Sequence, residues 1–274
     1  MKNKSITCVV PTLNSAKTLE PTLLSLNNQV GVDIEVTVVD SGSTDGTLDI
    51  CQRWNIQVIY APPGNMYRAI NSGIQRSNSE WVCYLNSDDL VFIDSLARLI
   101  DSGTTHNADI CYGDCDYIDD VGRFVYSFCS AYPNELLPLF RCKQMGFAQQ
   151  TAIYRRSLFN DLNGFDESFY FRADADFFIR ALLAGRRAIR LPAPSVACFR
   201  LHSGQFSNQG LIETELEAGR IFGRAELKPS LYDQLIHTYW KLRNTPHYLI
   251  RILRESTLSH RIRLPRAIES YDHK

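Results

Sequence analysis

The first 90 residues alternate four short apolar strands with three helical segments, and the connections between them are short and polar. The strands carry apolar β-formers on both faces, as is typical of a parallel sheet covered by helices. This order predicts an α/β fold with a doubly wound, mainly parallel sheet. The strands are expected at residues 6–10, 35–40, 57–60 and 81–85, with Pro11 ending the first, and the helices at residues 19–26, 48–54 and 65–77.

Two of these strands end in acidic side chains. Asp40 closes the second strand, and Asn86, Asp88 and Asp89 follow the fourth. The carboxyl ends of such strands face the ligand crevice, where adjacent carboxylates need a cation to neutralise them. Mg²⁺ or Mn²⁺ fits these oxygen ligands. The alternatives are an Asp that caps the helix starting near residue 93, and a turn-forming role for Asp40.

Composition narrows the class of protein. A chain of 274 residues can form one large α/β domain, or one domain with a smaller appended piece. Its net charge of −1 gives no sign of a nucleic-acid partner. The eight cysteines form no C-x-x-C pair, so buried reduced thiols are expected. Without a signal-peptide pattern or a long apolar run, a cytoplasmic location is expected, with contact at the inner face of the cell membrane left open.

Common nucleotide-binding and metal-binding motifs are absent from the sequence. No G-x-G-x-x-G follows the first strand, and no G-K-[ST] occurs, which disfavours a dinucleotide fold and a standard P-loop. Residues 40–51 begin with the spacing of an EF-hand, but Cys51 falls where that loop needs a Glu. A nucleotidyltransferase is a weaker alternative, because the turn after the first strand lacks a basic, Gly-rich loop.

Four segments together resemble the family 2 glycosyltransferases in their residue types, order and spacing. They are residues 9–14 (VVPTLN), 38–47 (VVDSGSTDGT), 67–74 (YRAINSGI) and 85–89 (LNSDD), and the resemblance extends over about residues 5–205. It implies a glycosyltransferase-A fold, a nucleotide-diphosphate sugar donor, a divalent metal, and inversion at the anomeric carbon. The sequence resembles members of the bacterial surface-polysaccharide type.

The resemblance also implies roles for individual residues. Asp40 is expected at the base, usually uracil, and Asp88 at the metal. Asn86 stands where the family often has an Asp, and Arg68 also departs from the pattern; Arg68 could hold phosphate or an acidic sugar, or be a plain surface residue. The expected donor-binding residues are Pro11, Thr12, Asn14, Asp40, Ser41, Gly42, Arg68, Asn71, Asn86, Ser87 and Asp88. The expected metal ligands are Asp88, Asn86, Asp89 and His202.

The acceptor half is expected to start near residue 106. Residues 109–114 and 123–128 read as antiparallel strands around a turn at residues 119–122, followed by a strand at residues 148–154 and a helix at residues 156–162. Asp174 stands at the expected start of another helix, where it could be an N-cap. The resemblance implies instead a general base that deprotonates the acceptor hydroxyl, and favours Asp174 over Asp176 for it.

The last part of the chain reads as helices, at residues 211–222, 231–242 and 247–258. The expected division is therefore a catalytic domain at residues 1–210, with halves at residues 1–105 and 106–210, and a helical extension at residues 211–274. Aromatic and aliphatic residues alternate there with Lys241, Arg243, Arg251, Arg254, Arg261, Arg263 and Arg266. This pattern is typical of a helix on an anionic membrane surface, or of one packed on the main domain or on a second subunit in a homodimer.

The sequence thus predicts an inverting, metal-assisted glycosyltransferase. It would move a sugar from a nucleotide-diphosphate donor, most simply a UDP-sugar, to a glycan or lipid-linked acceptor in surface polysaccharide synthesis. The alternative from another class is a nucleotide-sugar-binding protein that has lost turnover.

Overall fold

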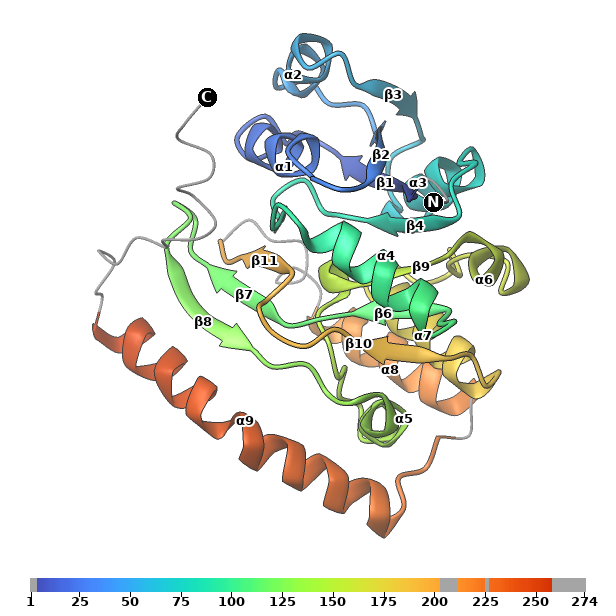
Figure 1. Cartoon of the computed structure of the whole chain (residues 1–274), viewed down its shortest axis with the longest axis vertical. Coiled ribbons are helices and arrows are strands. Elements are labelled where there is room, and N and C mark those ends of the chain that lie inside the picture. Colours follow the sequence, from blue (N-terminus) through green and yellow to red (C-terminus); the bar gives the residue numbers. More distant parts are fainter. Residues whose placement is uncertain (1–3, 203–210, 225–226, 258–274) are drawn as a thin grey trace.

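The computed structural model describes residues 4–202, 211–224 and 227–257 (Figure 1). Its centre is a seven-stranded sheet with the order β10-β6-β9-β4-β1-β2-β3, in which β9 alone runs antiparallel to its neighbours. The predicted parallel, doubly wound sheet and its first four strands are confirmed. The strands are β1 (Ser5–Thr12), β2 (Asp33–Asp40), β3 (Gln57–Tyr60), β4 (Trp81–Tyr84), β6 (Ile110–Tyr112), β9 (Ile153–Arg155) and β10 (Ala188–Arg190).

Pro11 does not end the first strand as predicted. The pairing of β1 with β4 stops at Val9, whereas its pairing with β2 continues to Thr12. Past Val9, β1 is therefore paired on one side only, where a residue without an N–H is tolerated. The strand thus carries Pro11 and Thr12 to the carboxyl edge of the sheet.

Helices cover both faces of this sheet and produce two separate apolar cores. One core packs α1, α2 and α4 against one face, and the other packs α3, α5, α6 and α7 against the opposite face. Gly73 shows how close α3 lies, because a Cβ there would stand 2.8 Å from the Val9 side chain. The helices are α1 (Leu19–Asn27), α2 (Thr47–Arg53), α3 (Met66–Gln75), α4 (Ser95–Thr105), α5 (Pro133–Arg141), α6 (Arg156–Asp161) and α7 (Ala173–Leu183).

A second, four-stranded sheet with the order β5-β11-β7-β8 stands beside the first (Figure 1). The hairpin predicted between residues 109–114 and 123–128 is wrong in its first strand, since β6 joins the central sheet and β7 pairs with β8. The predicted strand at residues 148–154 begins instead as a short 3-10 turn (Gln149–Thr151). The strands are β5 (Leu90–Val91), β7 (Cys115–Ile118), β8 (Phe124–Phe128) and β11 (Ala197–Arg200).

The C-terminal helices share the core of the sheet domain. Ile221 of α8 (Leu211–Arg224) and Trp240 of α9 (Leu231–Thr257) are buried in the same cluster as α3 and α7. Helix α9 runs along α5 and β8 (Figure 1). The boundary expected at residue 210 falls among residues that the structure does not describe.

The two helices predicted at residues 231–242 and 247–258 form the single helix α9, which passes through Pro246. Packing explains the continuity, because Trp240 and Asn244 are buried just before the proline. Side-chain hydrogen bonds also satisfy nearby carbonyls, from Asn244 to Trp240 and from Thr245 to Lys241. No helix among the described residues is long and apolar enough to cross a membrane.

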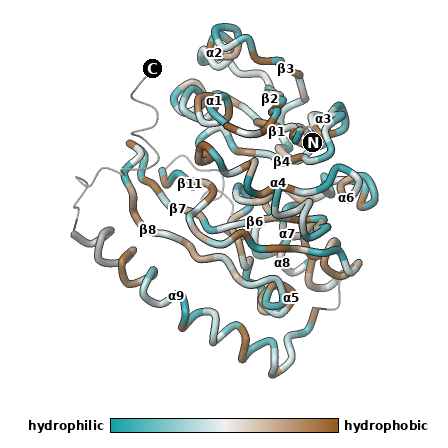
Figure 2. Tube along the Cα trace, viewed as in Figure 1, coloured by the Kyte–Doolittle hydropathy of each residue, from teal (hydrophilic) through white to brown (hydrophobic). Residues whose placement is uncertain are grey.

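Helix α5 was not predicted, although its start carries clear signals. Pro133 occupies the first helical position, and the carboxylate of Glu135 accepts a hydrogen bond from the Tyr132 backbone N–H at 2.8 Å. Figure 2 shows how polar and apolar residues alternate along such helices.

Candidate active site

Asp40 is buried at the end of β2, and its carboxylate organises the loop that follows. It accepts hydrogen bonds from the backbone N–H groups of Gly42 and Ser43, at 2.8 and 2.9 Å, and from the hydroxyls of Ser43 and Thr12, at 2.5 and 3.2 Å. Gly42 has a φ of 95°, a conformation that favours glycine. These contacts give Asp40 the turn-forming role that the sequence left as an alternative to contact with the base.

Asn14 joins the loop after β1 to the loop after β2. Its backbone N–H donates to the Ser43 hydroxyl at 2.8 Å, and its side-chain oxygen accepts from the Thr44 N–H at 2.9 Å. Next to it, the Ser15 N–H donates to the Thr47 hydroxyl at 2.8 Å. The two loops therefore form one continuous polar surface at the carboxyl edge of the sheet.

Ser87 extends this surface to the loop after β4. Its hydroxyl donates to the Ser15 hydroxyl at 2.8 Å. Two exposed apolar side chains border the same edge, Leu13 after β1 and Tyr60 at the end of β3. Tyr60 pairs with Asp40 in the strand register, and its hydroxyl would stand 3.9 Å from a Cβ at Gly42. Sequence reasoning did not select Leu13 and Tyr60, although both lie at strand ends.

Asp88 and His202 meet at the end of β4, although 114 residues separate them in the chain. The Nε2 atom of His202 lies 2.8 Å from Oδ2 of Asp88, and both side chains are partly exposed. Arg200 helps to hold this arrangement, because its Nε donates to the Asp88 backbone carbonyl at 2.9 Å. Two of the expected metal ligands are thus brought together on an accessible surface.

Asp89 behaves differently from its neighbour. Its carboxylate is 1 % exposed and accepts from the Arg200 backbone N–H at 3.0 Å and from the Asn86 amide at 3.4 Å. Burial and the nearby charge of Asp88 raise its pKa well above the usual range. The Asp89 carboxylate therefore accepts hydrogen bonds from its own loop, at Asn86, and from β11, at Arg200. These contacts do not favour the expected role of Asp89 as a metal ligand.

The loop also contains a polar atom suited to a metal. Among the described residues, the side-chain oxygen of Asn86 is buried and has no hydrogen-bond partner. In the described part of the chain, no three His, Cys, Asp or Glu side chains are placed to hold a metal ion together. Mg²⁺-type sites commonly use only one or two carboxylates and take further oxygens from substrate phosphates and water. Asp88, with Asn86 and His202 beside it, fits such a site.

Asp174 is the second residue of α7, whose N-cap is Arg172, so the cap role considered for Asp174 is not observed. The hydroxyl of Tyr67 lies 3.2 Å from Oδ1 of Asp174 and 3.1 Å from the Phe171 carbonyl. Burial raises the pKa of Asp174, and the Tyr67 and Ala175 hydrogen bonds only partly oppose this. A carboxyl group with a raised pKa is suited to accept a proton near neutral pH.

Asp176 is less available than Asp174. It is buried, and its Oδ2 lies 2.6 Å from Nε of Arg180 one turn along the helix. A cavity of about 490 Å³ lies on this side of α7. It is lined by Asp176 and Arg180, by the segment at residues 162–166 that follows α6, and by Ile221 of α8, with none of Asp40, Asp88 and Asp174 among its lining residues. The expected preference for Asp174 over Asp176 is consistent with these contacts.

Tyr67 connects Asp174 to the strand that ends at the Asp88 loop. Its ring packs edge-on against Tyr84, with centroids 6.5 Å apart, and Tyr84 is the last residue of β4. Tyr67 is buried in the first turn of α3, which Asn65 caps with hydrogen bonds to the Tyr67 and Arg68 N–H groups. Sequence reasoning quoted Tyr67 in a motif but gave it no role.

Two expected donor-binding residues of α3 face a different segment. The amide of Asn71 donates to the Phe165 carbonyl at 2.8 Å and accepts from the Phe165 N–H at 3.0 Å, and the side chain is buried. Arg68 forms an exposed ion pair with Glu167 at 3.1 Å. The expectation that Arg68 and Asn71 contact the donor is not supported, because both are engaged with residues 163–169.

Glu217 of α8 is a residue of the site region that the sequence did not reveal. Its buried carboxylate accepts the backbone N–H groups of Tyr170, Phe171 and Arg172, at 2.6, 2.9 and 3.0 Å. These residues lead directly into α7 and Asp174. No local sequence pattern marks such a contact, which depends on how α8 packs.

Comparison with known proteins identifies the family of this chain. The model of the family described as "Glycosyl transferase family 2" matches residues 7–162, more than half of the chain. A PGL/p-HBAD biosynthesis glycosyltransferase of Mycobacterium tuberculosis is 32 % identical over 186 residues, which cover 63 % of this chain and 67 % of the relative. The succinoglycan biosynthesis protein ExoO of Rhizobium meliloti is 29 % identical over 215 residues, covering 70 % and 60 %.

Solved structures show the same fold. S. aureus TarS in complex with UDP-GlcNAc aligns with a TM-score of 0.66 and 21 % identity, over 95 % of this chain and 76 % of that one. The mannosyltransferase PcManGT from Pyrobaculum calidifontis, in complex with GDP-Man and Mn2+, aligns with a TM-score of 0.63 and 19 % identity, over 98 % and 79 %. The chain therefore belongs to glycosyl transferase family 2, and it is a glycosyltransferase with the glycosyltransferase-A fold.

Proposed function

We propose that this glycosyltransferase transfers a sugar, with inversion, from a nucleotide-diphosphate donor to a hydroxyl of a glycan or lipid-linked acceptor in surface polysaccharide synthesis. The observation that carries the proposal is the link between two groups. The Asp88–His202 pair lies at the end of β4. Asp174 is held by Tyr67, whose ring packs on the last residue of that strand. In this proposal, Asp88 with His202 serves the phosphate side of the reaction, and Asp174 serves the hydroxyl side.

The names of similar proteins support this class of donor and product. One relative is named for PGL/p-HBAD biosynthesis, and another for succinoglycan biosynthesis. A third is named poly(ribitol-phosphate) beta-N-acetylglucosaminyltransferase TarP, from Staphylococcus aureus. Structural neighbours carry UDP-GlcNAc and GDP-Man, so we propose a nucleotide-diphosphate sugar and put a UDP-sugar first.

The nucleoside would lie on the surface formed by the loops after β1 and β2. Leu13 and Tyr60 offer exposed apolar faces against which a base can pack, beside the Asp40 loop. Polar contacts would come from the backbone and hydroxyls of this surface, since the Asp40 carboxylate is already bonded to it. We propose that Pro11, Thr12, Asn14, Asp40, Ser41, Gly42 and Ser87 form the donor surface.

A divalent ion, Mn²⁺ or Mg²⁺, would be held by Asp88 with Asn86 and His202. When bound, it neutralises the charge that builds on the departing diphosphate. Asp89 would position this loop through Arg200 rather than contact the ion. A carboxylate, an imidazole and an amide oxygen form a modest ligand set, so we expect donor and metal to bind together.

Asp174 would act as the general base. Among the described residues, Tyr67 and Ala175 both donate to its Oδ1, which leaves Oδ2 to take the proton of the acceptor hydroxyl. The acceptor oxygen then forms a bond to the anomeric carbon while the bond to the diphosphate oxygen breaks, and that oxygen keeps the electron pair. A single displacement of this kind inverts the configuration and needs no nucleophilic side chain.

The test is calorimetric binding of UDP, GDP and their sugars with and without Mn²⁺, followed by transfer assays over a panel of acceptors. We expect one nucleotide sugar to bind with metal and to yield an inverted product. Binding without transfer by any acceptor would favour a binding protein that has lost turnover. Retention at the anomeric carbon would overturn the single displacement.

A further inference from the structure

Helix α9 has two apolar faces, and only one of them packs on the rest of the protein. On the inner face, Trp240 is fully buried against Phe128 of β8, with ring centroids 5.8 Å apart. Arg243 pairs with the Glu135 carboxylate through both terminal nitrogens, at 2.8 and 2.7 Å. Trp240 and Arg243 lie in the helical segment for which the sequence left membrane contact open, and both serve this internal interface instead.

The outer face of α9 is apolar from Leu231 to Ile250. On a helical wheel at about 100° per residue, the exposed apolar residues from Leu231 to Ile250 fall within one arc of about 100°, bordered on one side by the exposed Thr238 and Thr245. The leucines are strongly exposed, with Leu231, Leu235 and Leu242 at 79 %, 69 % and 66 %. We call this set the outer face of α9; it consists of Leu231, Tyr232, Leu235, Tyr239, Leu242, Pro246, Leu249 and Ile250, all exposed.

This surface extends about 29 Å along the helix, at 1.5 Å per residue. Figure 1 shows α9 at the edge of the molecule, with its outer side facing away from both sheets. A long exposed apolar strip of this kind marks an interaction surface.

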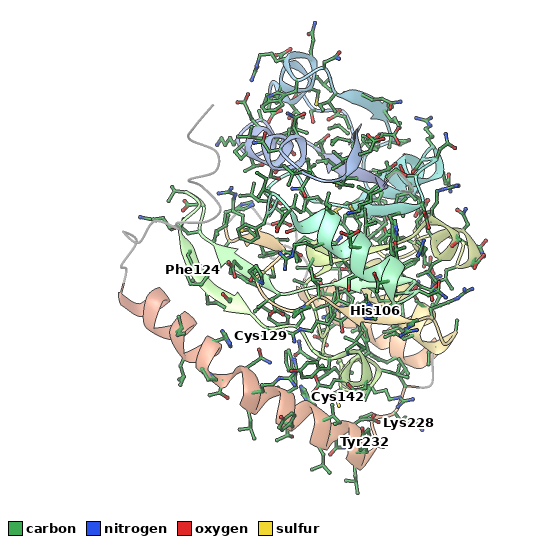
Figure 3. All side chains as sticks on the ribbon, viewed as in Figure 1. His106, Phe124, Cys129, Cys142, Lys228 and Tyr232 are labelled. Atoms are coloured by element: carbon green, nitrogen blue, oxygen red, sulfur yellow. The ribbon has the colours of Figure 1, made fainter. Side chains whose placement is uncertain are left out.

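The exposed charges on this segment favour one class of partner. Between Lys228 and Ile250 the chain has one acidic residue, Asp233, and that carboxylate is buried and paired with Arg141. Lys228 and Lys241 are exposed, and Figure 3 places Lys228 and Tyr232 at the N-terminal end of α9. Exposed charge on this segment is therefore basic, although the whole chain has a net charge of −1.

We propose that the outer face of α9 lies on an anionic lipid bilayer, with its leucines in the boundary between headgroups and acyl chains. Tyrosines and lysines beside an apolar strip are the pattern of a helix that lies in this interface. A second copy of this chain is a poorer partner, because a two-fold pairing of α9 brings basic side chains together and offers no exposed carboxylate on this segment. In the expected reaction, this would hold the enzyme beside a lipid-linked acceptor, a consequence that rests on the proposed function.

The experiment is flotation of the full chain with vesicles of phosphatidylcholine, alone or mixed with phosphatidylglycerol. We expect binding to the mixed vesicles, and a loss of at least about tenfold in partitioning for the double variant Leu235→Glu, Leu242→Glu. The double variant Lys228→Glu, Lys241→Glu should lose several-fold and become less sensitive to salt. The matched control, Val30→Glu with Val58→Glu, alters exposed apolar residues elsewhere and should bind as the unaltered protein does.

Two results would overturn the proposal. One is equal vesicle binding by the unaltered protein and the Leu235→Glu, Leu242→Glu variant. The other is a dimer in sedimentation that this variant converts to a monomer, which would assign the outer face to self-association. Melting temperatures check that each variant is folded. Transfer to a short water-soluble acceptor should be unchanged in the Leu235→Glu, Leu242→Glu variant. Failure of the membrane proposal is therefore distinguishable from failure of the proposed reaction.

Discussion

The two halves of the proposed active site are held together in different ways. On the donor side, the loops after β1, β2 and β4 are joined by short hydrogen bonds between their own hydroxyls, amides and carboxylates, such as Asn14 to Thr44 and Ser87 to Ser15. On the acceptor side, Asp174 is held by Tyr67 from α3, and the segment before it by Glu217 from α8. The proposed donor surface is thus assembled from strand ends, whereas the proposed acceptor side depends on distant helices.

Because of this difference, substitutions on the two sides should change different measured properties. Changes on the donor side should alter binding with little effect on the rest of the fold. Changes on the acceptor side should alter turnover, and stability as well where a buried anchor is lost. Four substitutions test the contrast.

The largest effect is expected for Asp174→Asn. Loss of the general base should lower kcat by about 10³-fold, while donor binding measured by calorimetry stays unchanged. Burial raises the pKa of Asp174 above its unfolded value, so its ionised form at neutral pH works against folding. The variant should therefore melt at the same or a higher temperature at pH 7, and this advantage should vanish at acidic pH. Normal turnover would refute the assignment of the base.

Asp88→Ala should impair the proposed donor and metal side of the site. We expect metal-dependent donor binding to weaken by at least about 100-fold, since loss of a partner outside the ligand shell already costs 10- to 100-fold in metal sites. Donor binding without metal should change little. The control is Asp94→Ala, an exposed carboxylate at the start of α4. Equal metal dependence in Asp88→Ala and the unaltered protein would remove Asp88 from the metal site.

Glu217→Ala should lower both the stability of the protein and its turnover. Three backbone N–H groups would lose a charged acceptor in a buried setting, at a cost of about 3 kcal/mol in the free energy of unfolding. Because these groups precede Asp174, kcat should also fall while donor affinity is kept. Glu215→Ala, an exposed residue of the same helix, is the matched control for chemical denaturation and kinetics. A stable, fully active Glu217→Ala would show that α8 does not position the base.

The smallest effect is expected for Tyr67→Phe. The Tyr67 hydroxyl lowers the pKa of Asp174, so its removal should raise that pKa further. The acidic limb of the kcat profile should move to higher pH, and stability should fall by about 1 kcal/mol for one lost hydrogen bond. Tyr232→Phe, on the outer face of α9, provides the control. An unshifted pH profile would mean that Tyr67 supports the helix packing but not the base.

Sequence patterns predicted more of the donor side than of the acceptor side. The four strands of residues 5–84 and the acidic residues at their ends were found because strand periodicity and turn residues are local signals. The second sheet was missed because β7 pairs with β11, about 80 residues away, and no local pattern encodes that partner. For the same reason, the contacts of Asn71 with Phe165 and of Asp89 with Arg200 could not be foreseen.

The sequence by itself determined the family, the order of the first strands and helices, and the acidic and amide residues that the strands deliver to one edge. Tertiary structure decided which of them remain available: Asp88 meets His202 while Asp89 turns inward, and Asp174 is held by Tyr67 while Asp176 pairs with Arg180. It also decided which face of α9 is covered. The physical reason is that periodicity fixes which side of an element a residue occupies, whereas burial and pairing depend on elements that arrive from elsewhere in the chain.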